Sequence, residues 1–296
     1  MKDMWNKLEE INSVLKGFAL CLPPSRNFIE ENFIEKAYAK LKNDESIVDD
    51  VVGIMISPRL RAFQMEFRYK KTKIFQPYLP VLEYGTFSAI VTDWVSAYLT
   101  LLPAVEASLR KWMELEPSLS LKSLHKFYYT FGKYYKHNIE SYDETRAHMA
   151  TEFLKYLKYC FKMLFMGFEE YSRNKFKEIF NRNFALHRLE GAKTLDESAS
   201  NVVRVILLLD VIAELYLMQN PEDWWHNYLQ VEAEQNLDFQ LRWHLYEKKA
   251  MQNAGHDDML IIQNVLGDKA SDKKKRAVIM KLKRDILKHA NEDPVY

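Results

Sequence analysis

One short segment of the sequence combines residue types that can move protons and bind an anion. It contains Arg182, Asn183 and His187, and Gly191 is expected to end the helix that carries them. The imidazole of a histidine has an ordinary pKa of about 6.5, so near neutral pH it can both accept and release a proton. At about 100° of rotation per helical residue, Asn183 and His187 lie about 40° apart, whereas Arg182 lies about 140° from His187. The face of one chain that carries Asn183 and His187 therefore lacks the arginine, and we expect a partner subunit to complete the site.

Other familiar catalytic and metal-binding motifs are absent from the sequence. The glycines are at least twelve residues apart, which excludes a Walker loop, a dinucleotide fingerprint and a kinase glycine-rich loop. The histidines are at least eleven residues apart and there are only 2 cysteines, so short His-pair metal motifs and zinc fingers are also absent. Two pairs one helical turn apart, Glu144/His148 and Asp210/Glu214, could in principle ligate a metal, but we expect surface or capping roles for them. We therefore expect neither a metal nor another cofactor.

The segment Arg182-Asn183-Phe184-Ala185-Leu186-His187 resembles the signature of the HEPN superfamily of helical ribonucleases. In that signature, Arg is followed by four to six residues and then His, and Asn, Asp or His commonly follows the Arg. The resemblance covers roughly residues 84–220, with an apolar helix expected before the motif and another after it. The Apea-like members, which are phage-defence or toxin proteins, are the most similar, although Arg188 stands where Gly usually follows their His. The resemblance implies a helical bundle that cleaves RNA as a homodimer.

The same resemblance implies a role for each residue of the motif. His187 would be the general acid and base, Arg182 would hold the scissile phosphate, and Asn183 would orient either by hydrogen bonding. Attack by the RNA 2′-hydroxyl needs a base, an acid for the departing 5′-oxygen and a cation beside the phosphorane, but no metal. A two-fold dimer supplies two histidines and two arginines. The pattern recurs from Arg284 to His289, and we expect that second copy to be a coincidence.

Three other interpretations remain open. The chain could be a non-catalytic all-α protein that binds RNA or a protein partner, or an inactive HEPN module that regulates a nucleotidyltransferase. Arg182 and His187 could also be cations that offset a helix dipole at a polar C-terminal turn. Residues 122–138 mix lysines with aromatic residues, as in surfaces that stack on single-stranded nucleic acid, and residues 269–288 carry a local charge excess of about +7. Ordinary amphipathic helices would explain both segments equally well.

The elements that must position the motif are predicted to be helices, and the first long one is expected at roughly residues 84–115. A chain of 296 residues with only 8 glycines and 9 prolines is typical of a mainly α-helical, multi-helix bundle. The exception is predicted at residues 51–70, where a β-branched run precedes an alternation of apolar and polar residues from Ala62 to Tyr69. We expect a small β-hairpin there. The sequence suggests an N-terminal helical segment with this hairpin (1–80), a HEPN-like helical domain (81–230) and a C-terminal helical extension with a basic last helix (231–296).

Charge and cysteine content suggest the compartment. The 42 Lys and Arg balance the 41 Asp and Glu to give a net charge of +1, so no global charge indicates a nucleic-acid or membrane partner. Cys21 and Cys160 do not make a disulfide framework, and residues 1–20 do not resemble a secretory leader. We expect a cytoplasmic protein without a membrane segment. Its expected partners are RNA, a second copy of the chain and a regulatory or antitoxin protein.

Overall fold

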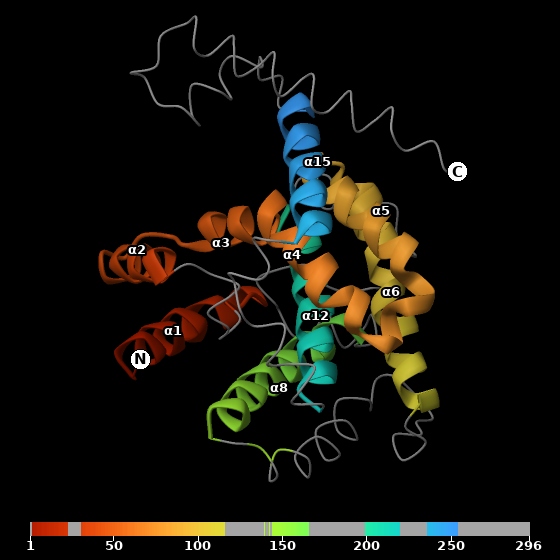
Figure 1. Cartoon of the computed structure of the whole chain (residues 1–296). Helices are drawn as coiled ribbons and strands as arrows, with labels where there is room; N and C mark the ends of the chain where they lie inside the picture. The colour runs from red at the N-terminus through yellow and green to blue at the C-terminus, as the bar shows by residue number, and fades with distance from the viewer. Residues whose placement is uncertain are drawn as a thin grey trace, which may run out of the picture. The chain divides into compact units, whose positions relative to one another are not determined.

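The computed structural model describes residues 2–22, 31–115, 139, 142, 144–165, 199–219 and 236–253. All regular secondary structure in these ranges is helical, which confirms the predicted mainly α fold (Figure 1). The chain divides into two compact units, Met1–Tyr246 and Glu247–Tyr296. The three-part division at 80 and 230 stays a prediction. None of the helices in the described ranges is long and apolar enough to cross a membrane.

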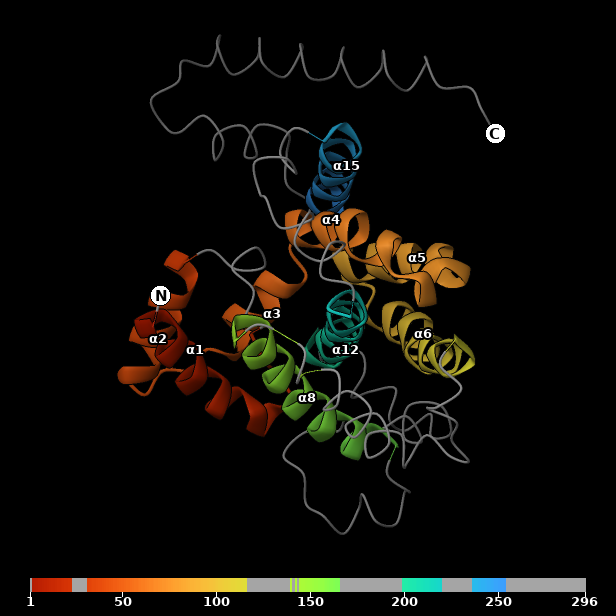
Figure 2. The ribbon, with the colours of Figure 1, turned by 60° about the horizontal axis from the view of Figure 1, so that its bottom comes forward.

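The first two helices pack against each other. Helix α1 (Lys2–Leu15) buries Leu8, Ile11 and Leu15, which share one face at helical spacing. A 3-10 turn, η1 (Lys16–Phe18), follows α1, and helix α2 (Glu31–Lys42) lies beside α1 (Figure 2). Surface ion pairs join the two helices, with the Lys7 Nζ atom 2.9 Å from a Glu35 carboxylate oxygen.

The predicted β-hairpin at 51–70 is wrong. Those residues belong to helix α3 (Val48–Met55), helix α4 (Pro58–Phe67) and the 3-10 turn η2 (Tyr69–Lys71). A half-exposed strand would bury one set of alternating residues and expose the other. On α4, both the apolar and the polar residues from Leu60 to Glu66 are buried. The alternation of apolar and polar residues therefore does not mark a buried face and a solvent-exposed face. The period-two pattern is produced by polar side chains that are needed inside the molecule.

A second departure concerns the long helix expected at roughly 84–115. After the turn η3 (Lys73–Tyr78), the chain forms two helices, α5 (Leu79–Ile90) and α6 (Trp94–Leu115). The break lies at Thr92, which has a left-handed φ of 60°, and the Asp93 carboxylate accepts a hydrogen bond from the Ser96 backbone N–H at 3.1 Å. Asp93 thus caps the start of α6. The two helices approach each other closely at Gly85, which has no side chain. A Cβ atom there would lie only 2.5 Å from the Leu101 side chain.

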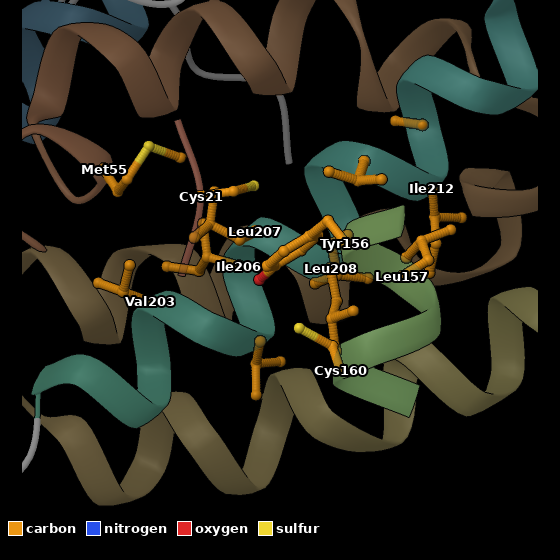
Figure 3. Close-up of a cluster of buried hydrophobic side chains, with 14 of the residues drawn as sticks. Cys21, Met55, Tyr156, Leu157, Cys160, Val203, Ile206, Leu207, Leu208 and Ile212 are labelled. Carbon is orange, nitrogen blue, oxygen red and sulfur yellow. The ribbon is translucent and has the colours of Figure 1, made fainter. Parts of the chain in front are cut away.

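Helix α12 (Ala199–Leu217) is the centre of the first unit. Its residues from Asn201 to Leu217 are buried, apart from the half-buried Tyr216. It contacts α3, α5, α6, η2 and helix α8 (Glu144–Phe165). Figure 3 shows Val203, Ile206 and Ile212 of α12 within the hydrophobic cluster. The prediction of a strongly apolar helix after the motif is therefore confirmed. The last described helix is α15 (Leu237–Asn253).

Candidate functional site

The predicted catalytic residues Arg182, Asn183 and His187 lie outside the described residues, and so do the second copy of the pattern and the basic segments 122–138 and 269–288. The structure does describe the helices on either side of the motif in the sequence. Helix α8 ends at Phe165, α12 begins at Ala199, and the two helices contact each other. The motif-bearing segment is thus connected at both ends to packed helices of the first unit.

Asp210 of α12 is held in a buried ion pair. The guanidinium of Arg61 on α4 donates to both carboxylate oxygens, with Nη1 to Oδ1 at 3.1 Å and Nη2 to Oδ2 at 2.7 Å. The Tyr69 hydroxyl also donates to Oδ1, at 2.7 Å. All three residues are buried. Burial, and then the charge of Asp210, raise the pKa of Tyr69 well above its usual value, so this hydroxyl stays protonated near neutral pH.

Glu214, one turn further along α12, has a similar partner. The Nε atom of Arg68 donates to its carboxylate, and both side chains are buried. The expectation of surface or capping roles for Asp210 and Glu214 is therefore wrong, because each carboxylate is occupied by an interior guanidinium. In the residues that the structure describes, no group of three or more His, Cys, Asp or Glu could hold a metal ion. These two ion pairs attach α4, through Arg61, and the residue that directly follows it, Arg68, to α12.

The other pair of candidate ligands lies at the surface. The His148 Nε2 atom on α8 is 3.5 Å from a Glu9 carboxylate oxygen on α1, and both side chains are well exposed. Glu144, at the start of α8, is exposed as well. The surface role expected for this pair is therefore confirmed.

The two thiols are free and buried. The Cys160 thiol and the Tyr156 hydroxyl both donate to the Ala19 carbonyl, at 3.8 and 3.3 Å. Figure 3 shows these two side chains with Cys21 inside the hydrophobic cluster. Burial raises the pKa of the Cys160 thiol to about 12 and that of Cys21 well above its usual value. Neither side chain is therefore a thiolate nucleophile near neutral pH.

A third charged cluster joins helix α15 to α4 and α5. Arg242 donates to the carboxylates of Glu66 and Glu83, and the Tyr246 hydroxyl also donates to Glu83. Lys70 lies 2.8 Å from the other oxygen of Glu66. The pKa of Glu66 is lowered, because these two cations outweigh the opposing effect of burial. Glu66 is therefore ionised near neutral pH.

Sequence reasoning missed these interior ion pairs, although one signal was present. Asp210 and Glu214 stand within a run of Val, Leu and Ile, where a buried carboxylate needs a cationic partner. The two cationic partners, Arg61 in α4 and Arg68 directly after it, are also close together in the sequence. The partners are 149 and 146 residues apart in the sequence, and this distance hides their pairing.

No protein-family model, curated protein or solved structure significantly matches the chain.

Proposed function

We propose that the protein is a HEPN-like, metal-independent endoribonuclease that acts as a homodimer, in the setting of a toxin or an anti-phage defence system. The observation that carries the proposal is the order Arg182-Asn183-Phe184-Ala185-Leu186-His187 within a chain whose described part is helical. The buried apolar helix α12, which follows the motif in the sequence, is in keeping with it.

The chemistry follows from the residue types. One His187 imidazole takes the proton from the 2′-hydroxyl, whose oxygen then attacks the adjacent phosphorus. A second His187 imidazolium gives a proton to the departing 5′-oxygen as the P–O bond breaks. The products are a 2′,3′-cyclic phosphate and a free 5′-hydroxyl. Arg182 neutralises charge on the pentacoordinate phosphorane, and Asn183 orients one of its neighbours.

A homodimer supplies what one chain lacks. Because the helix predicted for this segment would place Arg182 about 140° from His187, we expect its guanidinium to be directed away from the imidazole of its own chain. An isologous interface brings the same patch of two chains together, so it provides two bases, two cations and a symmetric cleft.

The decisive experiment is cleavage of total RNA by the purified protein in EDTA. The proposal expects fragments that end in 2′,3′-cyclic phosphate and begin with 5′-hydroxyl. Cleavage that requires a divalent cation and leaves 5′-phosphates would contradict the metal-independent mechanism. Unchanged RNA at every condition tested would leave the binding alternative as the better explanation.

That alternative, a non-catalytic interaction protein, is favoured by one observation on helix α15. Leu237, Leu241 and Leu245 follow each other at one-turn spacing with 66%, 48% and 50% of their surfaces exposed. Exposed leucines aligned in this way are typical of protein-binding surfaces. A pull-down with the Leu241→Ser variant as the negative control tests this function.

A further inference from the structure

The part of helix α15 that belongs to the first unit packs against α4 through one of its two apolar faces. Phe239 and Tyr246 are buried, and the Phe239 ring packs against Phe67 and Phe63 of α4, at centroid distances of 5.7 and 6.4 Å. Figures 1 and 2 both show α15 beside α4. The leucines of its exposed face, Leu237, Leu241 and Leu245, point the opposite way and contribute little to this attachment.

The same attached face carries an arginine clamp. Arg242 bridges Glu66 of α4 and Glu83 of α5, and its side chain is 18% exposed. Glu83 is the more accessible acid, at 36% exposure, while Glu66 is only 7% exposed. Arg242 therefore connects α15 to two helices at once, and its pair with Glu83 is the part of the clamp that water and salt can reach.

The helices beneath α15 are held independently of it. The pairs Arg61–Asp210 and Arg68–Glu214 attach α4 and the residue directly after it to the central helix α12, and α5 packs on α6 through Gly85. Removing α15 would leave these interactions in place. In contrast, a helix of about 17 residues has little stability by itself in water, so α15 depends on its attached face.

We propose that α15 is a releasable strap, fastened to Glu66 and Glu83 by Arg242, and that loss of this clamp frees α15 while α4, α5 and α12 stay folded. The inference is independent of the ribonuclease proposal. Salt weakens the Arg242–Glu83 pair of the clamp first, since an accessible ion pair is screened much more strongly than the buried pairs formed with α12.

Hydrogen exchange measured by mass spectrometry tests the strap with three forms of the full-length protein. These are the unmodified chain, Arg242→Met and the matched control Arg110→Met, whose arginine forms a surface pair with Glu106. We expect Arg242→Met to raise exchange in peptides covering 237–246 about tenfold or more, with no change in peptides of α12. Arg110→Met should change neither.

A second experiment varies the salt concentration and needs no variant, so it still tests the proposal if Arg242→Met does not fold. In the unmodified protein, raising NaCl to about 1 M, where the Debye length is about 3 Å, should speed exchange in α15 and leave α12 unchanged. Equal acceleration in both helices would show that α15 is an inseparable part of the core. Unchanged exchange in α15 under salt would likewise overturn the proposal.

Discussion

Arg61 on α4 and Asp210 on α12 face each other through a two-point ion pair, with both guanidinium Nη atoms bonded to the carboxylate and neither side chain exposed. The residues are far apart in the sequence, and their contact attaches the helix once expected to be a hairpin to the most buried helix. A buried pair of this kind contributes little relative to apolar residues of the same shape, but it is costly to break. The main consequence of this two-point contact is that it fixes the position of α4 relative to α12.

Replacing Asp210 by Ala should therefore destabilise the protein strongly. We expect the free energy of unfolding to fall by about 3–5 kcal/mol, because Arg61 is left buried and charged without its carboxylate. Urea denaturation followed by circular dichroism measures this loss. The double variant Arg61→Met/Asp210→Leu should recover most of it, and a double variant no more stable than Asp210→Ala would contradict this account.

Gln64 should behave in the opposite way. Both of its side-chain amide atoms are buried, and neither has a hydrogen-bond partner in the structure as described. Gln64→Met keeps the length of the side chain and removes the unsatisfied amide, so the free energy of unfolding should stay the same or rise by about 1 kcal/mol. Thermal denaturation provides the measurement. A clear drop in Tm would mean that the amide makes a stabilising interaction.

The raised pKa of the buried Cys160 thiol should make the protein less stable at alkaline pH. Its pKa is raised by burial from 9.0 to about 12 in the folded protein, so between these values the unfolded chain releases a proton that the folded chain keeps. This contribution to stability is intact below pH 9 and is lost as pH rises, by about 1.4 kcal/mol per pH unit. Cys160→Ala should show a shallower fall of unfolding free energy from pH 9 to pH 11. Identical slopes for the two proteins would refute the prediction.

His187 and Arg182 give the central test of the proposed function. His187→Ala should lower RNA cleavage about 10²–10⁴-fold, the usual contribution of a general acid or base, without changing the melting temperature. Arg182→Ala should have a similar effect through the phosphorane charge. His289→Ala, in the second copy of the pattern, is the matched control and should cleave normally. If His289→Ala were the inactive variant, the site would belong to the C-terminal copy.

The proposed enzyme should also be a two-fold dimer. Arg182 and His187 of one protomer are expected within about 10 Å of those of its partner, because reacting groups must be held close together. Size-exclusion chromatography with light scattering gives the mass of the active species. A stable monomer with full ribonuclease activity would refute a shared site.

The helical class and the central helix could be predicted from the sequence. The scarcity of glycine and proline favours helices along the whole chain. The segment 202–217 is rich in Val, Leu and Ile, which are stable only when buried, so local composition was sufficient to predict a central buried helix. The split between α5 and α6 was missed, since it depends on the single left-handed residue Thr92 and the cap supplied by Asp93.

The tertiary structure alone decided what the polar residues of α4 do. From Ala62 to Tyr69 a period-two pattern implies that Gln64, Glu66 and Arg68 face water, yet all three are buried. Arg68 is directed inward by Glu214, and Glu66 by Arg242, residues about 150 and 180 positions away in the sequence. A sequence pattern records which residues are polar but not whether a distant charge is available to pair with them. The pairing of Arg61 and Arg68 with acids of α12 exists only once α12 packs against this segment. It makes the segment a helix with a charged interior face rather than a strand with one face exposed to water.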